Sequence, residues 1–172
     1  MKILIVVDVQ YDFVYGPLGT PQAVDALSWI RSIVREAKEE GQLIVFTQDT
    51  HYANYLNTLE GKQLPVIHCV DGTDGWRVCK SVDDPSSVHV HKSTFGYLPW
   101  EDAFDRHEPI DEITLVGFCT DICVISNALI LKAQYPDIPI NVISKACAGT
   151  TVAKHNAALD VLASCQITVV DR

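Results

Sequence analysis

The segment from Val116 to Cys123 has the features of a nucleophile site. It reads Val-Gly-Phe-Cys-Thr-Asp-Ile-Cys, which predicts a buried strand, a glycine turn and a helix start, with Thr120 or Asp121 as N-cap. A thiol in the first helical turn lies at the positive end of the helix dipole, and a nearby lysine would lower its pKa further. Cys123 could then attack a carbonyl carbon as a thiolate. Taken alone, the segment is explained better if Cys123 is simply a small buried hydrophobic residue.

Two other residues change that balance. Asp8 follows an apolar run, and Lys92 follows Val88–Val90. A carboxylate beside a thiol can take its proton and later deliver it to a leaving amine, while an ammonium group stabilises both anions. Separately, Asp8 could cap a turn and Lys92 could be solvated. Together with Cys123 they make an acid/base, a cation and a nucleophile, and they predict a cysteine hydrolase.

A second group of residues is suited to a metal ion. Asp49 and His51 are two positions apart, so on an extended strand end both side chains lie on the same side. Their oxygen and nitrogen atoms suit zinc, iron or manganese. His68 could return as a third ligand and Glu60 as a fourth. The alternative is that Asp49 and His51 hydrogen-bond locally and that His68 is an ordinary loop histidine.

The elements that must position these residues alternate between strands and helices. Short apolar, β-branched runs without polar alternation are typical of strands buried on both faces, as in parallel sheets. The predicted strands are Ile3–Val7, Leu43–Thr47, Val88–Val90, Ile113–Val116, Ile140–Ile143 and Ile167–Val170. The predicted helices are Pro21–Glu40, Asp121–Tyr135, Thr150–Ser164 and a short Trp100–Arg106. This order predicts an α/β fold, a three-layer αβα sandwich with a six-stranded, mostly parallel sheet.

Asp8, Asp49, His51, Lys92 and the segment Cys119–Cys123 all follow strands of this sheet. Ligands of open parallel sheets bind beyond the carboxyl ends of the strands, so these residues should meet at one edge. The segment from Asp49 to Pro85 shows no strong periodicity, and an irregular insertion of this length inside a compact domain is often functional.

Length and composition limit the function further. The 172 residues are the size of one domain, residues 1–172, and a net charge of −9 disfavours nucleic acid and anionic membrane surfaces as partners. The first apolar run is too short for a signal or a membrane span, so we expect a cytoplasmic protein with reduced thiols. The six cysteines include no Cys-x-x-Cys pair, which excludes a zinc ribbon or a thioredoxin motif.

Taken in order along the chain, these motifs resemble the isochorismatase-like cysteine hydrolases, and among them most closely the nicotinamidases. The resemblance spans nearly the whole chain, and its Gly-x-x-Thr-Asp-x-Cys-Val block is specific. The motifs that carry it are Asp8-x-Gln10, Asp49-x-His51, His68-Cys69-Val70-x-Gly72-Thr73-x-Gly75, Lys92 and Gly117-x-x-Thr120-Asp121-x-Cys123-Val124.

The resemblance implies roles for individual residues. It implies a catalytic triad of Asp8, Lys92 and Cys123. It implies an oxyanion hole formed by the backbone N–H groups of Cys119 and Cys123, after a cis peptide bond between Phe118 and Cys119. It also implies a divalent metal ion, with zinc as the first choice and iron or manganese as alternatives; the expected ligands are Asp49, His51, Glu60 and His68.

The chain departs from the nicotinamidase pattern at two positions. Asn57 stands where many nicotinamidases have a second histidine, which leaves Glu60 as the nearest carboxylate ligand. Pro65 stands where many have an aromatic residue that stacks on the substrate ring. Phe13, Phe95 and Tyr97 remain as expected apolar lining of a substrate pocket.

The expected activity is that of an amidohydrolase. The first substrate is nicotinamide, cleaved to nicotinate and ammonia through a thioester on Cys123. An amidase for a carbamoyl or other small amide compound is the alternative within the superfamily, and a non-catalytic binding or thiol-sensing protein is the alternative outside it. Isochorismatase chemistry proper is disfavoured, because members with that activity lack the nucleophilic cysteine. We expect a small-molecule amide as the ligand and a homo-oligomer as the assembly.

Overall fold

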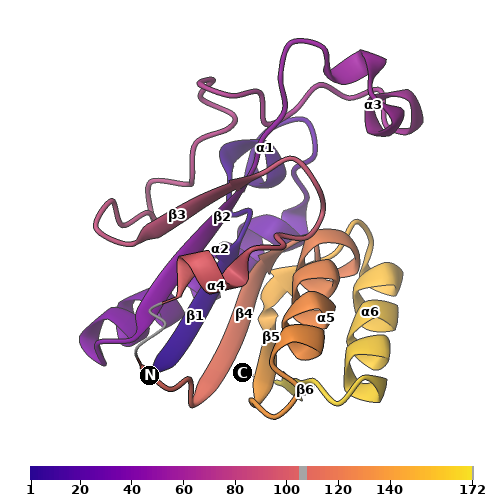
Figure 1. The fold of residues 1–172 in the computed structure, drawn as a ribbon. Coiled ribbons are helices and arrows are strands. Elements are labelled where there is room, and N and C mark those ends of the chain that lie inside the picture. Colours follow the sequence, from indigo (N-terminus) through magenta and orange to yellow (C-terminus); the bar gives the residue numbers. More distant parts are fainter. Residues whose placement is uncertain (105–107, 172) are drawn as a thin grey trace.

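The computed structural model describes residues 1–104 and 108–171, and its centre is a six-stranded sheet (Figure 1). The strand order is β3-β2-β1-β4-β5-β6, and all five pairings are parallel. The predicted α/β fold with a six-stranded sheet is therefore confirmed. The strands are β1 (Lys2–Val7), β2 (Leu43–Asp49), β3 (Val88–Lys92), β4 (Glu112–Phe118), β5 (Ile140–Ala148) and β6 (Thr168–Val170).

Three longer helices cover the sheet. Helix α2 (Pro21–Glu39) begins with proline in its first turn, and its N-cap Thr20 accepts a hydrogen bond from the backbone N–H of Ala23. It is followed by Gly41, whose positive φ of 67° suits a helix C-terminus. The other two are α5 (Ile125–Gln134) and α6 (Val152–Ser164), and the short helices are α1 (Tyr11–Val14), α3 (Leu59–Gln63) and α4 (Trp100–Ala103).

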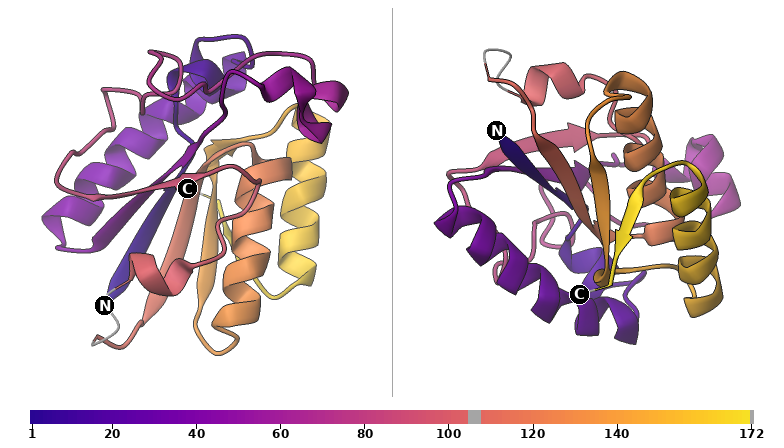
Figure 2. Two further views of the ribbon diagram at one scale, coloured as in Figure 1. Left: turned by 45° about the horizontal axis from the view of Figure 1, so that its top comes forward. Right: turned by 90° about the horizontal axis from the view of Figure 1, so that it is seen from below.

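The core divides into two layers because strand side chains alternate between the two faces of the sheet. Leu4 and Val6 of β1 pack in the cluster formed with α2, while Ile3 and Ile5 pack in the cluster formed with α4, α5 and α6. Figure 2 shows α2 on one side of the sheet and α5 and α6 on the other. Both faces are buried, which explains the unbroken apolar runs of the strands.

Several predicted boundaries differ from the structure. The helix predicted from Asp121 to Tyr135 begins instead as a π-helical turn, Thr120–Val124, that leads into α5. Neither Thr120 nor Asp121 is its N-cap: Cys119 precedes the turn, and the Asp121 carboxylate accepts hydrogen bonds from the N–H and hydroxyl of Thr150 at 2.8 and 2.6 Å. The helix predicted to end at Arg106 ends at Ala103, and Arg106 lies outside the described residues.

The chain that leaves β2 rises beyond the carboxyl ends of the strands, where α3 lies, and then returns along the side of the sheet to the start of β3 (Figure 1). It contains a 3₁₀ turn, Tyr55–Asn57, and helix α3, and it is the segment whose lack of periodicity predicted an irregular insertion. Searching the two described ranges reveals no helix with the length and apolar character needed to span a membrane.

Gly117 in β4 gives a direct test of this architecture. Its φ is 121°, and a Cβ atom at this position would collide with the backbone carbonyl of Val7 in the neighbouring strand. Gly117→Ala should therefore destabilise the fold by about 3 kcal/mol or more in urea unfolding. Gly41→Ala is the control: its φ is also positive, but no atom lies within 4 Å of the added Cβ. It should cost only about 1 kcal/mol, and equal losses in the two variants would contradict the close approach of the strands.

Candidate active site

The parallel sheet brings residues distant in sequence to one edge. The register of β2 and β3 pairs Asp49 with Lys92, and the register of β1 and β2 pairs Val7 with Thr47. The next residue after Val7 is Asp8, whose backbone N–H donates to the carbonyl of Thr47 at 3.2 Å. The carboxyl ends of β1, β2 and β3 therefore carry Asp8, Asp49 and Lys92 at adjacent positions.

Lys92 is the centre of the first cluster. Its Nζ lies 2.7 Å from Oδ2 of Asp8 and 3.5 Å from Sγ of Cys123. The other oxygen of Asp8, Oδ1, accepts a hydrogen bond of 2.6 Å from the hydroxyl of Thr47. All four side chains are buried, so their charges interact with little screening by water. The structure thus brings together the three residues expected to form the triad.

The protonation of these groups follows from burial and from their charges. Burial disfavours the Lys92 ammonium group, but Asp8, Cys123 and Asp49 outweigh this effect and raise the pKa of Lys92 above its usual value. The pKa of Asp8 is raised above its usual value, because the effect of burial exceeds the opposite effect of Lys92. Burial and the negative charge of the Asp8 carboxylate raise the pKa of Cys123 well above its usual value, although Lys92 lowers it. The expectation of a depressed thiol pKa is therefore wrong for this geometry, because burial and Asp8 oppose the lysine.

The turn that carries Cys123 is held by a buried side chain of α5. The peptide bond between Phe118 and Cys119 is cis, as the resemblance implies. Asn127 is fully buried; its Nδ2 donates to the carbonyl of Cys123 at 2.8 Å, and its Oδ1 accepts from the backbone N–H of Tyr97 at 2.8 Å. Asn127 therefore links the π-helical turn to the loop after β3.

The second cluster is the predicted metal group. The ligand atoms of Asp49, His51, Glu60 and His68 all lie within 4.8 Å of one another. Nε2 of His51 lies 3.0 Å from Asp49 and 3.5 Å from Glu60, and Nε2 of His68 lies 3.5 Å from Asp49 and 4.0 Å from Glu60. Asp49 also connects the two clusters, because its Oδ1 is 3.6 Å from Nζ of Lys92.

These four side chains fit a zinc ion. Tetrahedral coordination with bonds of about 2.0–2.2 Å places neighbouring ligand atoms about 3.3–3.5 Å apart, close to the separations given above. Nδ1 of His68 lies 2.7 Å from the carbonyl of Val66, so the ring can donate there and leave Nε2 for the metal. The proximity of two histidines, Asp49 and Glu60 is thus typical of a mixed nitrogen and oxygen site.

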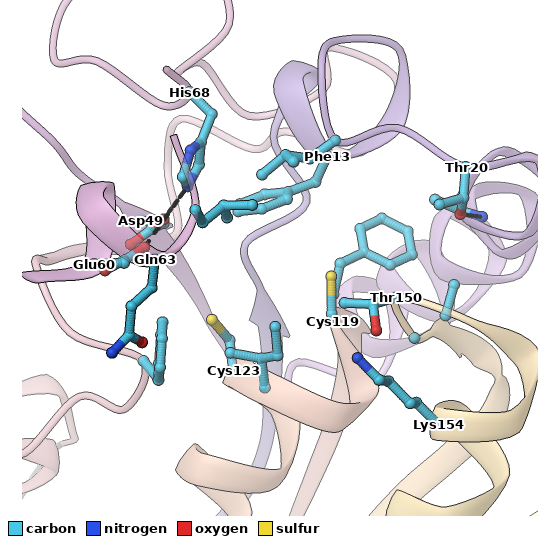
Figure 3. Close-up of a pocket in the computed structure, with 18 residues that line it drawn as sticks. Phe13, Thr20, Asp49, Glu60, Gln63, His68, Cys119, Cys123, Thr150 and Lys154 are labelled. Atoms are coloured by element: carbon cyan, nitrogen blue, oxygen red, sulfur yellow. Dashed lines mark hydrogen bonds and ion pairs between the residues drawn. The ribbon is translucent and has the colours of Figure 1, made fainter. Parts of the chain in front are cut away.

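Members of both clusters line one cavity of about 620 Å³: Cys123 of the first, and Asp49, Glu60 and His68 of the second. Figure 3 shows Asp49, Glu60 and His68 at one end and Cys119 and Cys123 along its floor. Phe13 and Phe95 line it, as expected for the apolar wall. Tyr97 does not, because its ring packs edge-on against Trp100 at a centroid distance of 5.0 Å. The full lining is Phe13, Leu18, Thr20, Ala23, Asp49, Glu60, Gln63, Leu64, His68, Phe95, Phe118, Cys119, Ile122, Cys123, Ala148, Gly149, Thr150 and Lys154.

Three supporting residues have no predicted role in the sequence analysis. Thr47 holds Asp8, Asn127 holds the turn of Cys123, and the buried Gln10 makes a pair of hydrogen bonds with the backbone of Asp49. Asn127 could have been noticed, since it is a polar residue inside a strongly apolar helix. Gln10 belongs to the Asp8-x-Gln10 motif, but nothing in the sequence shows that its side chain holds the backbone of Asp49. Thr47 carries no signal, because its contact with Asp8 follows only from the pairing of β1 and β2.

Comparison with known proteins agrees with this arrangement. The isochorismatase domain matches residues 2–172, so the chain belongs to the isochorismatase family. It is a nicotinamidase-like hydrolase of that family: the nicotinamidase of Escherichia coli (strain K12) is 24% identical over 193 residues, covering 91% of this chain and 87% of its own. The nicotinamidase/pyrazinamidase structure of Bacillus subtilis matches with a TM-score of 0.85 at 25% identity, covering 99% of both chains. The pyrazinamidase of Pyrococcus horikoshii, in complex with zinc, matches with a TM-score of 0.81 at 25% identity and the same coverage.

The opposing effects of Asp8 and Lys92 on Cys123 can be measured by alkylation. The rate with iodoacetamide should rise with pH, with a midpoint above that of a free cysteine, because the raised pKa keeps the thiol protonated at neutral pH. Asp8→Asn removes a carboxylate and should lower the midpoint, whereas Lys92→Met removes a cation and should raise it. Mass spectrometry of the peptide that contains Cys123 separates it from the other cysteines. Midpoint shifts of the same sign in both variants would disprove this electrostatic arrangement.

Proposed function

We propose that the protein hydrolyses the carboxamide of nicotinamide to nicotinate and ammonia through a thioester on Cys123. The observation that carries this proposal is that Nζ of Lys92 lies within 3.5 Å of both Asp8 and Cys123, and that Cys123 lines a cavity also lined by Asp49, Glu60 and His68. The nucleophile, with its acid/base group directly behind it, thus faces the same cavity as three of the four metal-ligating residues. The nicotinamidase relatives support this substrate.

In the first half of the reaction, Asp8 takes the proton of the Cys123 thiol as Sγ attacks the carboxamide carbon. Nζ of Lys92 lies 2.7 Å from Asp8 and 3.5 Å from Sγ of Cys123, so the carboxylate and the thiol are close enough for this proton transfer. The carbonyl oxygen becomes an oxyanion, which we assign to the backbone N–H groups of Cys119 and Cys123. When the carbon–nitrogen bond breaks, Asp8 returns the proton to the departing nitrogen, and ammonia leaves.

In the second half, water attacks the thioester carbon. Asp8 accepts a proton from this water, the carbon–sulfur bond breaks, and the proton passes to the Cys123 sulfur. The acid product leaves and the thiol is restored. Lys92 stays positively charged throughout, because the carboxylates around it raise its pKa, and it stabilises each anion that forms beside it.

A zinc ion held by Asp49, His51, Glu60 and His68 would supply a Lewis acid that binds a heteroatom of the substrate or a water molecule. Iron and manganese are the alternatives for this donor set. The cluster lies at one end of the cavity and Cys123 on its floor (Figure 3). Binding at that end would therefore fix the distance from the heteroatom to the carboxamide that Cys123 attacks.

A different small amide is the second candidate substrate. The cavity volume of about 620 Å³ lies within the range of about 300–1,000 Å³ that is typical of sites for drug-sized ligands. Leu64 and Phe95 line it, and the position that carries an aromatic residue in many nicotinamidases is the exposed Pro65. This wall offers room beyond a single pyridine ring.

The proposed activity is tested by ammonia release from nicotinamide, pyrazinamide and carbamoyl amides. Cys123→Ala and Asp8→Asn should each lower kcat/KM by at least about a thousandfold, because each removes a group that bonds to the reacting atoms or moves their protons. Cys165→Ser is the matched control: this thiol is exposed and outside the cavity, so the activity should be retained. Wild-type rates of ammonia release by Cys123→Ala would refute the thioester route.

A further inference from the structure

One cation in the cavity takes no part in the mechanism described above. Lys154 of α6 lines the cavity, and in Figure 3 its side chain points inward from the side opposite Asp49, Glu60 and His68. Among the described residues, none pairs with its ammonium group, whereas Lys92 is surrounded by carboxylates. The wall between the two ends is mainly apolar. The cavity therefore has an acidic, metal-ligating end and an opposite end that carries a free positive charge.

Thr20 and Thr150 also line the cavity but are drawn away from the Lys154 ammonium group by other partners. The hydroxyl oxygen of Thr20 accepts a hydrogen bond from the N–H of Ala23, and the hydroxyl of Thr150 donates to Asp121 at 2.6 Å. Lys154 is thus the cationic donor of this part of the lining, and an ammonium group suits a carboxylate.

We propose that the preferred substrate is an amide that carries a carboxylate, which Lys154 binds at this end while Cys123 attacks the carboxamide. This proposal rests on the proposed function and refines its substrate class. Lys154 is exposed at the rim of the cavity, so with a neutral amide such as nicotinamide its ammonium group would keep water as its partner, whereas a carboxylate would gain a charge-assisted hydrogen bond beside the apolar wall.

The test compares kcat/KM for amides with and without a carboxylate, in matched pairs: succinamate with butanamide, and ring-carboxylated nicotinamides with nicotinamide. The wild-type protein should prefer the carboxylated member. Lys154→Met should lower the ratio of carboxylated to neutral kcat/KM about tenfold, and Lys154→Glu should lower it further, whereas Lys154→Arg should retain most of it. Lys145→Met is the control, because Lys145 is a surface lysine that pairs with Asp171 outside the cavity.

The outcomes separate the two proposals. Hydrolysis of neutral amides without a carboxylate preference, or a ratio in Lys154→Met within about twofold of wild type, would overturn the role of Lys154 alone. Absence of ammonia release from every amide would overturn the amidase function itself. The melting temperature of each variant shows whether a change in the ratio accompanies a loss of folding.

A separate set of contacts concerns the scaffold of the metal-ligating cluster. The side chain of Gln10 is fully buried; its Oε1 accepts from the N–H of Asp49 at 2.8 Å, and its Nε2 donates to the carbonyls of Asp49 at 2.9 Å and Trp76 at 2.7 Å. Two residues later, Oδ2 of Asp12 accepts from the N–H of Cys69 at 2.7 Å. Cys69 directly follows His68, and its carbonyl accepts from the N–H of His51 at 2.9 Å.

These contacts come from one short segment and reach both sides of the cluster. Gln10 holds the backbone of Asp49, and Asp12 holds the loop of His68. From this geometry we infer that Gln10 and Asp12 are positioning residues that set the separation between the Asp49 carboxylate and the two histidine rings. Neither touches the cavity centre, so each acts through the ligands it holds.

The test is the zinc dissociation constant of the purified full chain. Gln10→Met keeps the side-chain length but removes all three hydrogen bonds, and it should weaken zinc binding about 10–100-fold. Gln48→Met is the control, because Gln48 is also buried and its side chain donates to the same Trp76 carbonyl at 3.2 Å, but makes no hydrogen bond to Asp49. It should bind zinc as the wild type does.

Asp12 gives a second, independent pair of variants. Asp12→Ala should weaken zinc binding, and Asp12→Asn should restore most of it, because an amide oxygen can still accept from the Cys69 N–H. Wild-type zinc affinity in Gln10→Met and Asp12→Ala, or no zinc binding by the wild-type chain, would overturn the inference. If Gln10→Met does not fold, the Asp12 pair decides.

Discussion

The burial of one ammonium group organises this site. Taking a lysine out of water costs several kcal/mol unless opposite charges surround it, and Lys92 meets this requirement with Asp8 at 2.7 Å and Asp49 at 3.6 Å. The same ammonium lies 3.5 Å from Cys123. Lys92 therefore compensates the charges of two buried carboxylates and at the same time contacts the nucleophile.

Asp49 makes the triad and the metal-ligating cluster a single electrostatic unit. Burial raises the pKa of Asp49, but hydrogen bonds from His51 and His68, together with Lys92, outweigh burial and hold its pKa well below its usual range. The group therefore stays ionised between a lysine and two histidines. Because Lys92 contacts both Asp49 and Cys123, a change in the charge or position of Asp49 would alter the electrostatic environment of Cys123. Gln10, which holds the backbone of Asp49, therefore supports both clusters.

The cavity is asymmetric, and this asymmetry bears on the substrate. One end gathers the carboxylates and imidazoles, the floor carries the thiols of Cys119 and Cys123, and Lys154 lies at the opposite side (Figure 3). Burial and nearby carboxylates raise the pKa of the Cys119 thiol to about 12, so it stays protonated beside Cys123. A ligand that spans the cavity would meet a metal-binding group, a nucleophile and a cation in that order.

The sequence by itself determined the parallel sheet, because unbroken apolar runs are stable only when both faces of a strand are buried. It also determined Asp8, Lys92, Cys123, Asp49 and His51 as the residues at the strand ends. It could not reveal the state of Cys123, since burial and Asp8 reverse the effect expected from the helix and the lysine. The pairing of Gln10 with Asp49, the position of Tyr97 against Trp100 and the inward direction of Lys154 depend on contacts between segments far apart in the chain. Only the tertiary structure decides such contacts, because local patterns record which residues are buried but not which of them meet.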